Sequence, residues 1–193
     1  MIKALKAYFL RDFDVTNVLD SAGGAELNRQ CQEHVQKRGN LSCGDVFTSC
    51  SGKLPCKVVV HTVGPVWHDG KTNEERDLEK AVYGALEACR KYNTVALPAV
   101  SCGVFGFPHD LAAKITVRKI REFMMMDSLV SRIDVVVTRK DVISEFHRAL
   151  VTTFGPEKVS NLNQAPVSSS AVDSGSNCFL ANRCTLYYFE FVF

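Results

Sequence analysis

The chain has 193 residues, of which 46% are hydrophobic and 23% charged, and its formal net charge is +2. This length suits one domain, or one domain with a tail, and it is enough to bury a sizeable core. The near-neutral charge and the lack of a lysine or arginine run argue against sequence-independent binding to a nucleic-acid duplex. No uncharged apolar stretch reaches the roughly 18 residues of a membrane span, so we expect no membrane segment.

Helices and strands are predicted to alternate through most of the chain. In chain order we expect a helix over 25–37, strands over 45–49 and 57–63, a helix after 72, a strand over 94–100, a helix over 108–125, a strand over 132–138 and a helix over 141–154. The helices have apolar residues three or four positions apart, whereas 57–63 is a β-branched run typical of a strand buried on both faces. The alternation predicts an α/β fold with helices packed on both faces of a mixed or largely parallel sheet.

The segment 72–75 predicts the start of a helix. Its sequence, Thr-Asn-Glu-Glu, fits a capping box in which Thr72 caps the first turn and Glu75 reaches back to the backbone. Apolar residues at helical spacing follow and predict the buried face: Leu78, Ala81, Val82, Ala85 and Cys89.

The two ends of the chain differ from this pattern. Residues 1–20 form an atypical N-terminal segment, and 156–193 contain a serine-rich, linker-like stretch at 167–176. The aromatic end, 185–193, is a candidate for a terminal strand. We therefore expect a domain over 21–155 that is followed by a flexible tail.

The cysteines indicate a reduced protein. Eight cysteines in a chain of this length do not make a disulfide scaffold, and lysines interrupt the apolar N-terminus, which makes it a poor signal peptide. We therefore expect a nuclear or cytoplasmic location. Cys43, Cys50 and Cys56 with His61 lack the paired spacing of a zinc site, so no metal is predicted.

The segment 97–108 is the most informative part of the sequence. An apolar strand runs into Gly103 and Gly106, and Pro108 suits the first turn of a helix. Glycines let the backbone come close to a ligand and turn its N–H groups toward it. A loop between the carboxyl end of a strand and the start of a helix is a natural site for phosphate oxygens, although a tight connection without a ligand would have the same sequence.

Three segments together resemble the macrodomain family. Residues 52–65 are similar to its second characteristic motif, 101–108 to its second phosphate loop, and 21–27 to the junction between its first helices. The likeness covers about 18–155, and the Lys-Leu-Pro-Cys-Lys of 53–57 is closest to macrodomains of poly(ADP-ribose) polymerases. The resemblance implies a three-layer α/β/α fold with a mixed, largely parallel sheet that binds ADP-ribose, free or attached to proteins.

The resemblance also implies which residues contact the ligand. Backbone amides of 101–106 would wrap the diphosphate, Phe105 would lie near the distal ribose, and Ala99 would lie at the mouth of the cleft. The implied ligand-binding residues are Ala99, Ser101, Cys102, Gly103, Val104, Phe105 and Gly106. No catalytic residue and no cofactor other than the ligand ADP-ribose is expected.

Residues 1–20 depart from the family pattern. They contain no counterpart of the first strand with its asparagine segment, of the first glycine-rich phosphate loop or of the adenine-binding aspartate. No aromatic residue is found near Thr138 and Arg139, where many relatives stack one on adenine. The first strands are therefore missing or replaced. Residues 1–10 could fill the slot, although Ile2, Leu5 and Phe9 also fit a helix.

Four functions follow as alternatives. The first is non-catalytic recognition of ADP-ribose, and the second is an ADP-ribosyl hydrolase, which would need the asparagine of the missing segment. The third is a cysteine enzyme that uses Cys102 with His61 or His109, because a thiol near a helix N-terminus can be activated. The fourth is a truncated or alternatively spliced, binding-impaired fragment that acts through protein contacts.

Overall fold

The computed structural model describes residues 5–7, 15–137, 139–156, 160–161 and 187–190. Its elements, in chain order, are β1 (Leu5–Ala7), α1 (Val15–Arg38), β2 (Val46–Cys50), β3 (Val58–Thr62), α2 (Glu74–Ala88), β4 (Thr94–Pro98), α3 (His109–Met124), β5 (Arg132–Val137), α4 (Lys140–Phe154), β6 (Ser160–Asn161) and β7 (Tyr187–Glu190). The predicted helices and strands between residues 25 and 154 are all present.

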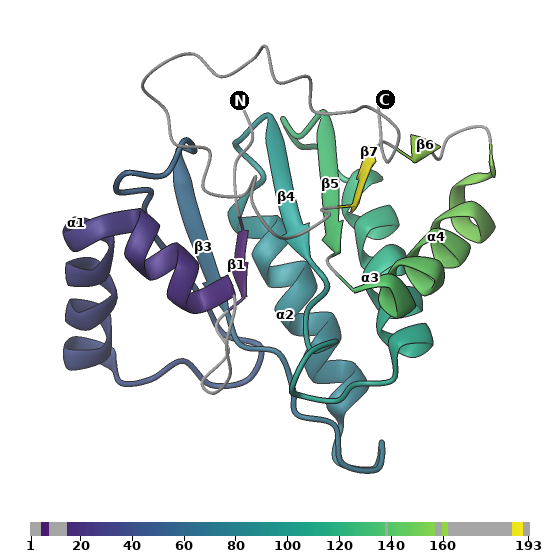
Figure 1. Cartoon of the computed structure of the whole chain (residues 1–193), viewed down its shortest axis with the longest axis horizontal. Helices are drawn as coiled ribbons and strands as arrows, with labels where there is room; N and C mark the ends of the chain where they lie inside the picture. Colours follow the sequence, from purple (N-terminus) through teal and green to yellow (C-terminus); the bar gives the residue numbers. More distant parts are fainter. Residues whose placement is uncertain (1–4, 8–14, 138, 157–159, 162–186, 191–193) are drawn as a thin grey trace.

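The strands form a mixed sheet with its parallel pairs near the centre. One ladder has the order β1-β3-β2 and the other β4-β5-β7-β6. β1 lies between β3 and β4, so the two ladders adjoin (Figure 1). β1 is parallel to β3 and β4 to β5, whereas β2, β7 and β6 are added antiparallel. The predicted three-layer α/β/α architecture is confirmed.

Residues 5–7 replace the strand for which the sequence shows no family counterpart. Leu5 pairs with Val60 and Ala7 with Thr62 in a parallel register. The alternative that residues 1–10 form a helix is wrong for these three residues. Pairing with β1 gives β3 hydrogen-bonding partners on both sides, since β2 covers its other edge.

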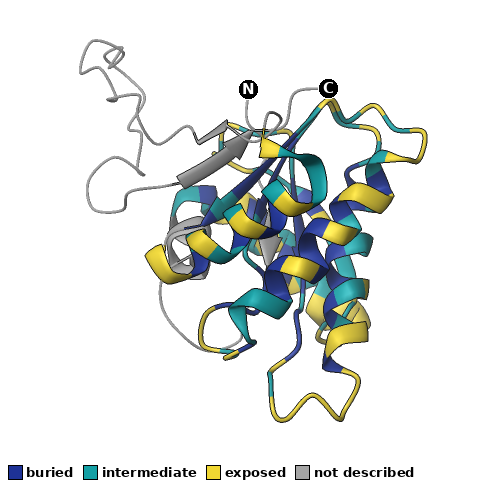
Figure 2. Ribbon diagram, turned by 90° about the vertical axis from the view of Figure 1, so that its right-hand side faces the viewer, coloured by how far each residue is buried: buried dark blue, intermediate teal, exposed yellow. Residues whose placement is uncertain are grey.

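Helices cover both faces of the sheet, because successive side chains of a strand point to opposite sides. Val59 of β3 packs with Leu27 and Cys31 of α1, whereas Val60 packs in the larger core with α2. Figure 2 shows the buried stripes of the helices turned toward the sheet and the exposed stripes turned to solvent. The predicted apolar face of α2 is buried at every position.

The helix predicted over 25–37 is the second arm of a longer, kinked helix. α1 begins at Val15, and Gly24 interrupts it with φ 75°. A hydrogen bond from the β2–β3 connection stabilises the kink, because the Lys53 N–H donates to the Gly23 carbonyl at 2.9 Å. A Cβ on Gly52 would lie 1.9 Å from the same carbonyl oxygen, so only glycine fits there.

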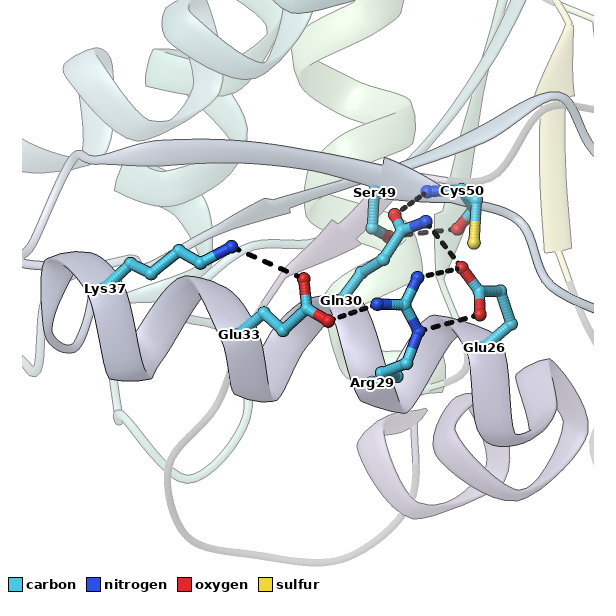
Figure 3. A network of polar contacts seen from close by, with 7 residues as sticks. All are labelled: Glu26, Arg29, Gln30, Glu33, Lys37, Ser49 and Cys50. Atoms are coloured by element: carbon cyan, nitrogen blue, oxygen red, sulfur yellow. Dashed lines mark hydrogen bonds and ion pairs between the residues drawn. The ribbon is translucent and has the colours of Figure 1, made fainter.

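The outer face of α1 carries a polar network that also reaches the sheet (Figure 3). Arg29 pairs with both Glu26 and Glu33, and Glu33 pairs with Lys37. Gln30 lies between this network and β2, and its side-chain oxygen accepts from the Cys50 N–H at 2.8 Å. The bond satisfies a backbone donor at the end of an edge strand and fixes α1 against it.

The predicted capping box before α2 is wrong. Asn73, not Thr72, is the residue before the helix, and its backbone is left-handed with φ 67°. This turn brings the side chain of Glu74, rather than Glu75, back toward the preceding backbone. Likewise, α3 starts one residue later than expected, at His109, and ends at Met124, after which Met125 and Met126 are exposed.

The C-terminal part is described at only a few positions. β7, within the predicted terminal strand, pairs antiparallel with β5 from Val135–Phe189 to Val137–Tyr187. β6, also within the predicted tail, pairs antiparallel with β7. Apart from residue 156 and these two strands, the predicted tail lies outside the described residues. In the described part of the chain, no helix is both long and apolar enough to cross a membrane.

Candidate functional site

The candidate loop, residues 99–107, connects the carboxyl end of β4 to the start of α3. It brings all seven predicted ligand-binding residues together in one turn. Ser101 and Gly106 have left-handed backbones, with φ 63° and 64°. A serine in this region is strained, and such strain is often found where the backbone must serve a function.

Internal hydrogen bonds fix the shape of the candidate loop. The Cys102 N–H donates to Ala99 at 3.3 Å, Gly106 to Gly103 at 3.0 Å and Phe107 to Ser101 at 3.1 Å. These three bonds close the turn on itself. Internal bonds of this kind restrict a loop to one conformation, and a preorganised loop loses less entropy when it binds a ligand.

The tip of the candidate loop faces outward and has unused donors. Gly103, Val104 and Gly106 are exposed. Among the described residues, no backbone hydrogen bond uses the N–H of Gly103 or Val104. A Cβ on Gly103 would meet no atom within 4 Å, and its φ is not in the left-handed region. Neither packing nor backbone strain in the folded chain therefore requires glycine at position 103.

The base of the candidate loop is packed tightly. Ser101 is fully buried, and its Oγ has no hydrogen-bond partner in the described part of the chain. Gly64, after β3, lies directly against it, since a Cβ there would be 2.3 Å from that oxygen and 2.6 Å from Val100. The loop thus combines a rigid, buried base with an open tip.

The interpretation of Cys102 as a catalytic nucleophile is wrong. The residue is 3% exposed, and burial raises the pKa of its thiol to about 12, so it is protonated at neutral pH. His61 Nε2 lies 2.8 Å from Ser49 Oγ and 3.7 Å from Cys31 Sγ, within the core. His109 pairs with Asp141 at 3.4 Å. The side chain of Cys102 is therefore part of the packed base of the loop.

Two residues at the site were not predicted from the sequence. Arg139, after β5, donates from Nη1 to the Cys102 carbonyl at 3.4 Å and also pairs with Asp141. Trp67, after β3, donates its backbone N–H to the Phe105 carbonyl at 2.8 Å. The signal in the sequence for the Trp67 contact was the tryptophan itself, which lies shortly after the Gly-Pro that ends strand 57–63.

The described residues contain no cluster of three histidine, cysteine or acidic side chains that could hold a metal ion. Of the cysteines considered with His61, Cys43 is exposed, and Cys50 and Cys56 are partly buried.

The chain is similar in sequence to proteins of a known family. The family model described as "Macro domain" matches residues 2–116. A protein of Escherichia fergusonii named O-acetyl-ADP-ribose deacetylase is 32% identical over 159 residues, which cover 81% of this chain and 89% of that protein.

The solved structures agree with this match. The Oceanobacillus iheyensis macrodomain with ADP has a TM-score of 0.69 at 27% identity and covers 78% of this chain and 83% of its own. A single-residue variant of that macrodomain with ADPR has a TM-score of 0.70 at 26% identity and covers 78% of this chain and 85% of its own. Since the family model covers more than half of the chain and the deacetylase-named relative exceeds 30% identity, the chain belongs to the macro domain family.

Proposed function

We propose that this chain recognises ADP-ribose, free or attached to proteins, through the backbone amides of the candidate loop. The observation that carries the proposal is the tip of the loop, where Gly103 is open to solvent, makes no demand on the fold and has an unused N–H. A glycine of this kind allows a phosphate to approach the backbone more closely than any side chain would permit.

The charge of the loop surroundings suits a diphosphate. The backbone N–H groups of Gly103 and Val104 make no backbone hydrogen bond in the described chain and are available to phosphate oxygens. The loop also leads into the N-terminus of α3, where the helix dipole favours anions. Arg139 is 53% exposed and lies beside the loop. A phosphate can be bound in this way by a chain whose net charge is only +2.

We further propose that recognition is non-catalytic. Hydrolysis needs a polar group or an activated water beside the ribose. Within the candidate loop the hydroxyl and thiol groups belong to Ser101 and Cys102, and both are buried. The alternative, hydrolysis, is supported by the relative from Escherichia fergusonii, which is named O-acetyl-ADP-ribose deacetylase.

The cellular setting is part of the same proposal. The sequence of residues 53–57 supports a kinship with the macrodomains of poly(ADP-ribose) polymerases, and the free cysteines of the described chain support a nuclear or cytoplasmic location. ADP-ribosylated proteins are then the expected partners.

Titration calorimetry with ADP-ribose tests the proposal. We expect a saturating, exothermic signal with a dissociation constant in the micromolar range and a stoichiometry near one. Absence of heat at millimolar ADP-ribose would contradict recognition and favour a fragment that acts through protein contacts. In a parallel incubation with O-acetyl-ADP-ribose, release of acetate would contradict the non-catalytic proposal and favour hydrolysis.

A further inference from the structure

The segment between β3 and α2 contacts the candidate loop through Trp67. The backbone N–H of Trp67 donates to the Phe105 carbonyl at 2.8 Å. The indole of Trp67 meets the ring of Phe107 edge-on, with the ring centroids 4.7 Å apart. Phe107 is fully buried at the end of the loop. One residue thus holds the loop by its backbone and supports it by its side chain.

Trp67 is partly buried, and the turn that follows it, residues 68–72, lies against one part of its indole. Gly70 lies against the indole, since a Cβ there would be 2.8 Å from Cη2, and its φ of +77° is one that glycine adopts readily. Any movement of this turn would therefore release one side of the indole.

The turn is held by the carboxylate of Glu74. Although Glu74 begins α2, it is only 3% exposed, because the left-handed Asn73 directs the chain back on itself. Its Oε2 accepts from the Thr72 N–H at 2.7 Å and its Oε1 from the His68 N–H at 3.3 Å. Burial raises the pKa of Glu74, but hydrogen bonds from its own backbone N–H, from the Thr72 side chain and from the Thr72 and His68 backbone N–H groups outweigh burial and lower the pKa to about 2. The carboxylate is ionised at neutral pH.

We propose that Glu74 is a positioning residue for ADP-ribose recognition: it fixes turn 68–72, which holds Trp67 and, through it, the candidate loop. The ligand part of this inference rests on the proposed function. The positioning part concerns the unliganded protein, because every contact in the series is already present there. The carboxylate of Glu74 accepts hydrogen bonds from His68 and Thr72, and neither residue is predicted to contact the ligand.

Trp67 also provides a spectroscopic reporter, since it is the sole tryptophan of the chain. Its indole contacts Phe107, two residues beyond the predicted ribose neighbour Phe105. Binding of ADP-ribose to the loop is expected to change the intensity or wavelength of tryptophan emission, and release of turn 68–72 is expected to shift the emission toward that of exposed indole.

The experiment compares Glu74→Gln with Glu75→Gln in the full chain. The two positions are adjacent and both changes remove one negative charge, but Glu75 is exposed. In Glu74→Gln without ligand, we expect hydrogen exchange to rise about tenfold in turn 68–72 and in the candidate loop, with β5 and α4 unchanged. With ligand, we expect the affinity for ADP-ribose to fall about tenfold. Glu75→Gln should match the wild type in both measurements.

The outcomes separate the two proposals. Faster exchange in turn 68–72 alone, with the candidate loop unchanged, would overturn the positioning role, and so would a uniform rise in exchange that includes β5 and α4. If the wild type shows no binding of ADP-ribose, the proposed function fails, and exchange in the candidate loop still decides whether Glu74 positions it.

Discussion

Replacing Gly103 by valine is expected to weaken ADP-ribose binding at least a hundredfold while leaving stability almost unchanged. Apart from its neighbours in the chain, a Cβ at this exposed position meets no atom within 4 Å, so the fold should accept valine within about 0.5 kcal/mol. The same side chain would project from the tip of the loop, into the space that we assign to the diphosphate. Calorimetry and thermal unfolding of the same variant measure the two effects.

Gly39→Ala is the matched control. Gly39 follows the end of α1 with φ +81°, and a Cβ there also meets nothing within 4 Å. Alanine is strained at this φ, so we expect a loss of about 1 kcal/mol in stability with no change in affinity. If Gly103→Val binds ADP-ribose as tightly as the wild type, the phosphate does not approach the backbone at this glycine.

Replacing Phe107 by alanine is expected to lower the free energy of unfolding by about 3–5 kcal/mol. Phe107 is 1% exposed, is among the largest fully buried side chains and packs both in the main core and against Trp67. Its removal leaves a cavity directly beneath the candidate loop. Urea denaturation followed by circular dichroism measures the change.

Leu129→Ala provides the comparison for this substitution. Leu129 is 70% exposed, so the loss of its side chain should alter the free energy of unfolding by less than about 0.5 kcal/mol. If Phe107→Ala costs less than about 1 kcal/mol, the loop base is not part of the packed core as described here.

The elements that depend on local pattern could be predicted from the sequence. The β-branched run of β3 and the apolar stripe of α2 are buried as expected, and that of α4 is buried in part, because periodicity selects which side faces the sheet. The candidate loop was also predictable, since the strand, the two glycines and the proline lie within one short segment. The choice of ADP-ribose as the expected ligand came from the resemblance to the macrodomain family.

Features that depend on contacts between distant segments were not predictable. The kink at Gly24 arises because Gly52 and Lys53 approach the Gly23 carbonyl from another part of the chain. The prediction of a capping box was wrong because Asn73 has a left-handed backbone, so that the carboxylate of Glu74, not of Glu75, accepts from the preceding backbone N–H groups. Similarly, the contact of Arg139 with the Cys102 carbonyl depends on β5 lying next to β4.

The most direct test of the account is to follow the backbone amide resonances of 15N-labelled protein during titration with ADP-ribose. The account predicts that the amides of Gly103 and Val104 shift most, with smaller shifts at Phe105 and Gly106 and little change at the exposed end of α3 near Met125. Saturable binding that leaves the Gly103 and Val104 amides unmoved would contradict the claim that the main chain of this loop holds the diphosphate.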